Sequence, residues 1–570
     1  MKTANRTGAQ MTTPAELYET HRELLDRAVA ATRSRDYWSA YPESPSKSVY
    51  GEEAAPAGEQ AFRDQLNGDF EIDLPGVTGS VATERSPYGF ELGIRYPTAD
   101  PAALIAAARA ATPAWRAAGP QGRAGVAAEI LRRINARSFE FAQAVQHTTG
   151  QAFVMAFQAG GPHAQDRGLE AVAAALDATT RGPAEATWTK PQRGGDPLRM
   201  TKTATVAGRG VAVVIGCNTF PTWNSYPGIF ASLVTGNPVI VKPHPGAVLP
   251  LALTVRIARE VLAEAGQSPD LVTLAAESPG DGIAVTLATH PDVRIVDFTG
   301  SSDFGNWLEA NARQAVVYTE KAGLNTVVVD STDDYKGLLR NLSFSLSLYS
   351  GQMCTTPQNF LVPAGGVRTD AGTRTPEEFA ADLSAAVDKL LGDPQRAAGT
   401  LGAIVNDGVL SRLTEASGAA SVVRPTGEVA DPQWPDATIR TPVVVRLDAA
   451  DDKVYTREWF GPVSFVITTA STAESLEIFV ETVRHHGALT ASVYSTSPEV
   501  IEAARDAALD AGVHLSENLT GGVFVNQTAA FSDLHGTGAN PAATAALTDD
   551  WFVSGRFFVL QSRRHTELEK

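Results

Sequence analysis

Short apolar runs that alternate with helical segments are the feature of this sequence that most limits its fold. From Gly210 onward, the β-branched runs include GVAVVIG, NPVIVKP, DLVTL and VRIVDFTG, and segments with helical spacing such as PLALTVRIAREVLAEAG lie between them. Buried strands that alternate with helices predict a parallel sheet covered on both faces. A second α/β region extends from LNTVVVD to about FVNQ. We therefore predict an α/β fold with two lobes and a site in the cleft between them.

The N-terminal part of the chain has a different pattern. The length of 570 residues corresponds to roughly four domains of average size, although two large α/β lobes account for most of it. Residues 1–75 begin with helical spacing from Pro14 to Arg33 and continue as a stretch rich in Pro, Gly and Ser. We expect an N-terminal arm that is ordered only if it docks on the body. Alanine-rich helices are predicted between Pro101 and Val145.

Charge and cysteine content exclude several classes of protein. Lys and Arg number 47 and Asp and Glu number 64, so the net charge is 47 − 64 = −17. The sequence has no basic stripe of the kind that binds nucleic acids. It also has no apolar stretch long enough to cross a membrane. The start of the chain lacks the apolar core of a secretory signal. Cys217 and Cys354 are the two cysteines, which excludes a disulfide framework and a zinc site built on CxxC pairs. We expect a cytoplasmic protein with no metal.

Two features are typical of a nucleotide site. In VRIVDFTGSSDFG, a strand is followed by Gly300 to Gly305 and then a helix, the arrangement in which a helix N-terminus receives a phosphate. A single Gly-x4-Gly is weak evidence, because glycines after a parallel strand also make ordinary turns. Lys242 ends the strand of VIVKP and suits ribose hydroxyls or phosphate, although a solvated lysine beside a turn is the commoner case.

Three further residues are candidates for chemistry. Cys354 lies in LYSGQMCTT, between a helix end and a new strand. A lone thiol in an apolar run is usually a core residue, and Cys217 fits that interpretation well. Glu320 ends a strand, where burial would raise its pKa and make it a general base near neutral pH. Glu458 precedes a Trp-Phe-Gly-Pro turn. For both glutamates an exposed carboxylate in a turn is the alternative.

Taken together, these motifs resemble those of the aldehyde dehydrogenases over about residues 80 to 560. VKP, FTGSSDFG, Glu320-Lys-Ala-Gly and GQMC follow one another in the family's order, and EWFGPV resembles its ExFGPV element. The separation of 34 positions between Glu320 and Cys354 also agrees with the family.

The resemblance implies a division of the chain. It predicts a Rossmann-type NAD(P)-binding domain from residues 76–190 and 208–321 and a catalytic domain from residues 322–540. Small bridging strands from residues 191–207 and 541–570 would make a homodimer or homotetramer. The coenzyme residues that it implies are Lys242, His244, Gly300, Ser301, Gly305, Glu458 and Phe460.

The resemblance also implies a reaction. Cys354 would attack an aldehyde and form a thiohemiacetal, which is oxidised to a thioester that Glu320 hydrolyses by activating water. An oxyanion would be held by the Cys354 backbone N–H and an asparagine side chain. The family's asparagine belongs to an N-F-P motif, where this chain has Thr219. We expect Asn218 to serve after a local shift of the loop, with Asn224 as a weaker candidate.

A second departure from the family concerns the coenzyme. NAD-preferring members usually have a glutamate three residues after the lysine, where this chain has Pro245. A missing carboxylate removes repulsion against a 2′-phosphate, and His244 could add a donor. The sequence therefore predicts that NADP is accepted and preferred, with NAD as the other candidate.

The predicted substrate comes from a closer resemblance. TFPTWNSYPGIF, EKAGLN and LYSGQMCTTPQN are most similar to the PaaN-type dehydrogenases of phenylacetate degradation. That similarity implies a ring-opened, CoA-linked semialdehyde, with no ring-hydrolase domain because the chain ends at Lys570. The alternatives are the semialdehyde of dehydroadipyl-CoA, or a general aromatic or aliphatic aldehyde. A CoA-acylating enzyme is less favoured because Glu320 is present. A catalytically silent binding paralogue is the alternative of a different class.

Overall fold

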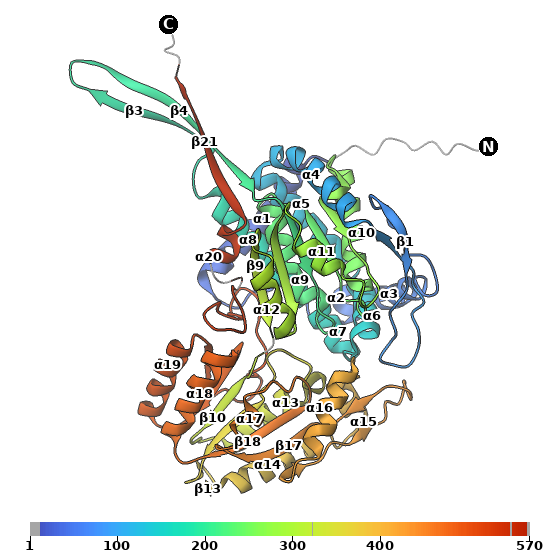
Figure 1. Ribbon diagram of the computed structural model, residues 1–570, viewed down its shortest axis with the longest axis vertical. Coiled ribbons are helices and arrows are strands. Elements are labelled where there is room, and N and C mark those ends of the chain that lie inside the picture. The colour runs from blue at the N-terminus through green and yellow to red at the C-terminus, as the bar shows by residue number, and fades with distance from the viewer. Residues whose placement is uncertain (1–11, 322, 546, 548–549, 567–570) are drawn as a thin grey trace.

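The computed structural model describes residues 12–321, 323–545, 547 and 550–566, which form two α/β lobes and a small projecting sheet (Figure 1). Residues 1–11 of the predicted N-terminal arm lie outside the described residues, as do residues 546, 548–549 and 567–570 of the predicted C-terminal bridging element. No helix within the described ranges is long and apolar enough to cross a membrane.

The first lobe is built on a five-stranded sheet in which every neighbouring pair is parallel. Its order is β7 (Val272–Leu274), β6 (Val239–Lys242), β5 (Val211–Ile215), β8 (Val293–Gly300) and β9 (Val316–Lys321). Alternate residues of β5 enter two different cores. Val213 faces the core formed with α4 (Pro101–Ala117), α11 (Ile283–Ala288) and α12 (Ser302–Asn311), and Val214 faces α9 (Pro221–Val234) and α10 (Leu249–Glu264). The predicted parallel sheet with two covered faces is confirmed.

The second lobe contains a seven-stranded sheet. Its order is β14 (Val422–Arg424), β17 (Val443–Asp448), β18 (Val463–Thr469), β11 (Asn359–Pro363), β10 (Thr326–Val329), β19 (Thr490–Tyr494) and β20 (His514–Glu517). The β14–β17 pair is antiparallel and the others are parallel. One face packs on α13 (Tyr335–Ser347) and α14 (Pro376–Leu390), and the other packs on α16 (Asp407–Ser417), α18 (Thr472–His486) and α19 (Pro498–Ala511). Both lobes therefore have the α/β organisation expected from the sequence.

The N-terminal segment docks on the first lobe. The helix predicted from Pro14 to Arg33 is confirmed as α1 (Pro14–Ser34), and Thr13 and Glu16 form a capping box at its start. Leu25 of α1 is fully buried in the core shared with α5 (Gly119–Asn135) and α8 (Pro162–Thr180). Further along, α3 (Ala54–Arg63) packs on α6 (Ser138–Thr149). These contacts meet the condition that the sequence set for an ordered arm.

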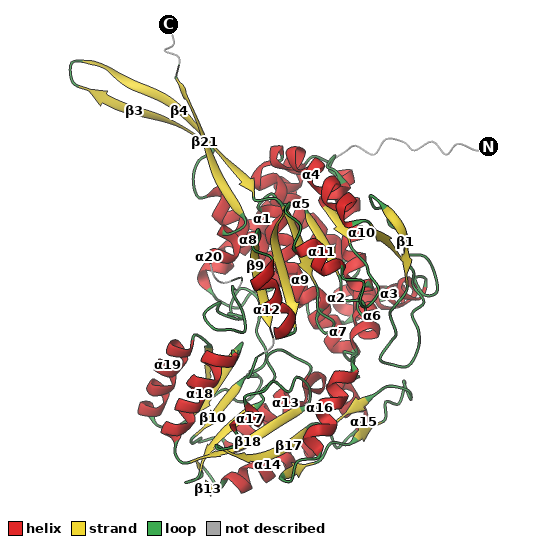
Figure 2. Cartoon of the chain, in the orientation of Figure 1, coloured by secondary structure: helices red, strands yellow, loops and turns green. Residues whose placement is uncertain are grey.

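A three-stranded antiparallel sheet projects from the body (Figure 2). It consists of β3 (Glu185–Gln192), β4 (Gly195–Gly208) and the C-terminal β21 (Phe557–His565). Phe558, Val559 and Leu560 are exposed on it.

The predicted domain boundaries stay a prediction. The remaining elements are short or peripheral: α2 (Lys47–Tyr50), β1 (Val77–Val81), β2 (Tyr96–Ala99), α7 (Phe153–Gly160), β12 (Val367–Thr369), β13 (Gly372–Arg374), α15 (Pro394–Leu401), β15 (Glu428–Val429), β16 (Ile439–Arg440), α17 (Asp452–Tyr455) and α20 (Asp550–Ser554).

Candidate active site

A tight turn after α13 carries Cys354. Tyr349 and Ser350 are fully buried and have positive φ angles of 54° and 50°, a region that non-glycine residues rarely adopt. Gly351 follows with φ 64°, and a Cβ at this position would lie 2.4 Å from the Gly461 carbonyl oxygen. The glycine of the GQMC motif is therefore required by its close approach to the EWFGPV turn, which fixes the backbone that leads to the thiol.

Buried amides hold this turn in place. The Gln352 side chain donates to the carbonyls of Tyr349 and Ala403 at 3.2 and 3.0 Å, and it accepts from the Val405 N–H at 3.0 Å. The carbonyl of Cys354 accepts from Asn325 Nδ2 at 2.7 Å. Because both ends of the turn are satisfied by buried donors and acceptors, the thiol has a fixed position.

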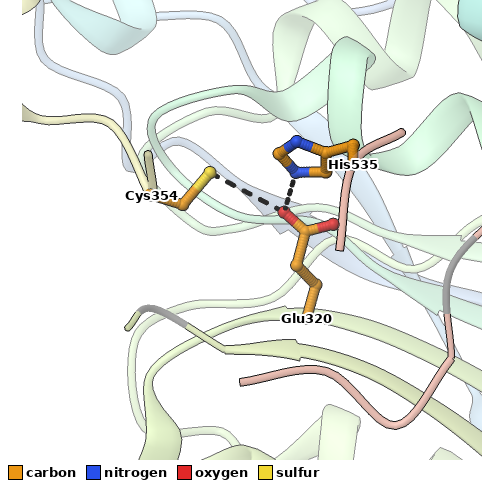
Figure 3. Close-up of side chains that lie close together, drawn as sticks. All are labelled: Glu320, Cys354 and His535. Carbon is orange, nitrogen blue, oxygen red and sulfur yellow. Dashed lines mark hydrogen bonds and ion pairs between the residues drawn. The ribbon is translucent and has the colours of Figure 1, made fainter. Parts of the chain in front are cut away.

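Three side chains from distant segments converge on one oxygen of Glu320, at the end of β9. Its Oε1 atom lies 3.7 Å from Cys354 Sγ, 3.0 Å from His535 Nε2 and 2.9 Å from Asn224 Nδ2. Figure 3 shows the thiol and the imidazole on either side of the carboxylate. The first two atoms belong to the loops after α13 and β20, and Asn224 lies in the first turn of α9. Folding thus places a thiol, a carboxylate and two nitrogen donors within one contact shell.

The ionisation of the pair differs from the sequence expectation. Burial raises the pKa of Glu320, but the positive charge and hydrogen bond of His535, with Arg167 and Asn224, outweigh it, so that the pKa is lowered. The prediction that burial gives Glu320 a raised pKa was wrong, because sequence reasoning supplied no partner for the carboxylate. Burial and the neighbouring Glu320 charge hold the pKa of Cys354 well above its usual range. The resting site therefore holds a carboxylate beside a neutral thiol.

The asparagine candidates occupy different places. Asn218 Nδ2 donates to the Thr148 carbonyl at 3.3 Å, and the Asn218 side chain lies beside Gly246 in the loop after β6. Asn224 lines the cavity that contains Cys354. The oxyanion role stays a prediction for Asn218, and the geometry favours Asn224, the candidate that sequence reasoning ranked lower.

Lys242 lies at the carboxyl end of β6 as predicted, but it has a partner that the sequence did not suggest. Its ammonium group forms a buried ion pair with Glu277, which follows β7. The other carboxylate oxygen of Glu277 accepts from the Ile283 N–H at 2.8 Å. His244 is exposed, and its Nδ1 accepts from the Gly246 N–H at 3.1 Å. Glu277 therefore supplies a carboxylate beside Lys242, although Pro245 occupies the position where the family's glutamate was expected.

The glycine turn after β8 has the expected layout. Ser301 is the N-cap of α12, with its Oγ 3.5 Å from the Phe304 N–H, and a Cβ at Gly305 would lie 2.6 Å from the Lys321 side chain. Gly305 thus permits close packing of α12 on β9. Because β8 ends at Gly300 and α12 begins at Ser302, the N-terminus of α12 lies at the carboxyl edge of the sheet. This arrangement suits the phosphate of a dinucleotide.

The last two predicted coenzyme residues lie in the loop after α17. Burial raises the pKa of Glu458 to about 7, although the charge of Arg412 opposes the rise. The Phe460 carbonyl accepts from Arg412 Nε at 2.8 Å. The coenzyme roles of Glu458 and Phe460 stay a prediction.

A cavity of about 790 Å³ opens beside the thiol, and Cys354, Asn224 and His535 lie in its wall. A volume in this range suits a small organic ligand. The ligand atoms of Glu320, Cys354 and His535 all lie within 4.8 Å of one another, so this trio could also hold a metal ion that binds sulfur and nitrogen. Sequence reasoning predicted no metal, and it missed both His535 and Glu277 because no local motif marks them.

Fold and site define a class of protein: a two-lobed α/β protein with a half-buried thiol that faces a carboxylate. The sequence profile of the aldehyde dehydrogenase family matches residues 94–531. A crystal structure of an NAD-dependent aldehyde dehydrogenase from Burkholderia multivorans is 57% identical, with a TM-score of 0.95, covering 97% of this chain and 99% of that one. This chain belongs to the aldehyde dehydrogenase family.

More distant relatives act on different aldehydes. The N-succinylglutamate 5-semialdehyde dehydrogenase of Chromobacterium violaceum is 27% identical over 67% of this chain and 74% of its own length. The vanillin dehydrogenase of Pseudomonas fluorescens is also 27% identical, over 69% of this chain and 78% of its own. The predicted enzyme class is confirmed, and these relatives leave the substrate to be argued from the site.

Proposed function

We propose that Cys354 is the nucleophile and Glu320 the base of an NAD(P)-dependent oxidation of an aldehyde to a carboxylic acid. The observation that carries this proposal is the shared Glu320 oxygen, which contacts the thiol and two hydrogen-bond donors at once. A neutral thiol needs a base before it can attack, and the ionised carboxylate 3.7 Å away can accept its proton.

The reaction then has two stages. As Sγ bonds to the carbonyl carbon, the Cys354 N–H and the Asn224 amide would stabilise the oxyanion of the thiohemiacetal. A dinucleotide, when bound, would supply the oxidation by accepting a hydride from the thiohemiacetal carbon, so that a thioester remains on Cys354. Glu320, again ionised after its proton passes to solvent, takes a proton from the attacking water. The C–S bond breaks, the acid leaves and the thiol is restored.

For the coenzyme, the sequence argument for NADP rested on the absence of a carboxylate near Lys242. Glu277 supplies one, paired with that lysine. A carboxylate at this edge accepts a hydrogen bond from a ribose hydroxyl and repels a 2′-phosphate. We therefore propose that NAD is the favoured coenzyme and that NADP is used less well. The name of the Burkholderia multivorans structure supports NAD.

For the substrate, we propose a bulky aldehyde that is uncharged in the part that enters the cavity. The semialdehyde of a ring-opened, CoA-linked chain from phenylacetate catabolism is the candidate that the PaaN-type motifs suggest, and its acyl part is uncharged. An aromatic aldehyde is the second candidate, favoured by the aromatic side chains Phe220, Trp223, Phe344 and Phe524 in the cavity wall.

For assembly, we propose a homodimer or homotetramer. The support is the exposed apolar row Phe558, Val559 and Leu560 on the projecting β21, which an adjoining subunit would cover.

A turnover assay tests the proposed function. The full chain is mixed with an aromatic aldehyde and with either NAD or NADP, and the absorbance of the reduced nicotinamide is followed while the acid product is identified by mass spectrometry. Acid formation with consumption of coenzyme is expected. A thioester product that forms only when free CoA is added would contradict the hydrolytic role of Glu320.

A further inference from the structure

The N-terminal segment forms part of the wall around the thiol. Tyr37, Trp38, Ser39 and Glu43 line the same cavity as Cys354. Asp166 of α8 holds this segment, because its carboxylate accepts from Ser39 Oγ at 2.6 Å and from the Ala40 N–H at 2.9 Å. Trp38 also packs edge-on against Phe531, with ring centroids 4.8 Å apart. The cavity is therefore closed on one side by a segment that precedes both lobes.

Apart from the paired histidines His163 and His535, the charged side chains of this wall are acidic. Among the described residues that line the cavity, Glu43, Asp166 and Asp533 are acidic, and none is Lys or Arg. Arg167 stands behind Trp223, with its guanidinium 5.0 Å from the ring centre, but it is buried and bonded to Glu170 at 2.8 Å. His163 is paired with Glu43 at 2.7 Å. The described residues of this wall therefore offer no unpaired cation to hold a substrate carboxylate.

The rim of the cavity is apolar instead. Tyr37, Val154 and Val523 line it and are exposed at 71%, 55% and 61%, although large apolar side chains are usually covered. Deeper in the wall, the rings of Phe344 and Phe524 lie 4.1 Å apart. A substrate that reaches from the rim to the thiol would therefore contact apolar surface along its length.

We propose that this cavity selects aldehydes whose body is apolar and uncharged and rejects semialdehydes that end in a carboxylate, with Glu43 and Tyr37 of the N-terminal segment contributing to the selection. The proposal rests on the proposed function and narrows its substrate class. A desolvated carboxylate with no cationic partner, close to Glu43 and Asp533, is costly, whereas an ester or a hydrocarbon chain is not. Aromatic aldehydes and the acyl chain of a CoA thioester share this chemistry.

A matched pair of substrates tests the selection. We compare kcat/KM for benzaldehyde with a para methyl ester and for the same ring with a para carboxylate, using the full chain. We expect the ester to be preferred by about tenfold or more. Equal or better use of the carboxylate would overturn the proposal. A CoA-linked semialdehyde and its free acid are compared in parallel. This second pair shows whether the uncharged body of the substrate is an aromatic ring or the acyl chain of a CoA thioester.

Variants locate the effect in the N-terminal segment. Glu43→Lys adds a cation at the rim and should lower the ester-to-acid ratio by about fivefold, mainly through KM for the acid. Glu52→Lys makes the same charge change at an exposed position outside the cavity wall and should leave the ratio unchanged. An equal fall in both variants would show a general charge effect and refute the role of Glu43.

A binding readout separates this proposal from the proposed function. Each aldehyde is tested for protection of Cys354 from alkylation by iodoacetamide, a measurement that requires no turnover. Absence of turnover with protection by the ester alone would contradict the proposed function and support the selective cavity. Equal protection by ester and acid would contradict the selective cavity, whatever the turnover.

Discussion

His535 Nε2 lies 3.0 Å from Glu320 Oε1, the same oxygen that faces Cys354 Sγ. The histidine side chain is nearly buried and stands edge-on to Trp223. The groups that face Glu320 are His535, Arg167, Asn224 and the two thiols of Cys354 and Cys217. His535 is the ionisable group that touches the carboxylate with a donor nitrogen, which makes it a positioning residue for the base.

Replacement of His535 should change the pH dependence of turnover. In His535→Ala, burial acts on Glu320 with less opposition, so its pKa rises and the carboxylate is protonated at a higher pH. The acidic limb of the kcat–pH profile should then move to higher pH by about one unit. In His535→Gln the amide can still donate to Glu320, so the acidic limb should move less than in His535→Ala. An unmoved limb, as expected for the exposed control His485→Ala, would contradict the assignment.

The two cysteines should respond differently to removal. Cys354→Ala should lower kcat by at least about a thousandfold, because no other thiol faces the cavity. Burial raises the pKa of Cys217 to about 11, and its Sγ donates to Asn224 Oδ1 at 3.5 Å. Cys217→Ala is therefore the matched control and should retain most of the activity. Steady-state kinetics checks both variants, and retained activity in Cys354→Ala would disprove the mechanism.

Loss of the base should separate the two stages of the reaction. Glu320→Gln keeps the shape of the side chain and, in its amide oxygen, an acceptor for His535, but it cannot accept a proton from water. Hydrolysis of the thioester should slow by about 10² to 10⁴. A rapid burst of reduced coenzyme, followed by slow turnover, is expected in stopped-flow measurements at alkaline pH, where the thiol ionises without Glu320. Unchanged steady-state turnover would exclude Glu320 as the base.

Glu277 should set the coenzyme preference. Its carboxylate is paired with Lys242 and bonded to the Ile283 N–H. Glu277→Gln removes one negative charge, so the ratio of the NADP and NAD dissociation constants should move toward NADP by about tenfold. Calorimetric titration without aldehyde measures both constants. Tighter binding of NADP by the unaltered protein would support the prediction made from Pro245 and contradict the proposal that NAD is favoured.

Arg556 should be critical for stability. It is fully buried before β21, and its guanidinium contacts both oxygens of Asp297 on β8, at 2.7 and 2.5 Å. Arg556→Met leaves the Asp297 charge buried and unpaired, which should cost about 3 to 5 kcal/mol. Urea unfolding measures the loss, and Arg340→Met at an exposed position on α13 is the control. Recovery of stability in Arg556→Met with Asp297→Leu would confirm that the unpaired charge is the cause.

The sequence was informative where the signal is local. The β-branched runs predicted the strands around Val213 and Val214, because a parallel sheet covered on both faces needs apolar residues on each side. Motif order predicted that Cys354 and Glu320 act together, and the fold brings them within 3.7 Å. Asn218 was favoured over Asn224 because local spacing shows how far a residue is from a motif but does not show where its side chain points.

The sequence by itself determined the α/β class and the family, and it predicted which thiol and which carboxylate act, since these inferences rest on short-range periodicity and contiguous motifs. The tertiary structure decided the partners: His535 and Asn224 at Glu320, Glu277 at Lys242, and an N-terminal segment in the substrate wall. These contacts join residues far apart in the chain, and their energies depend on burial and on the charges that burial brings together. The ionisation of Glu320 was therefore decided by packing.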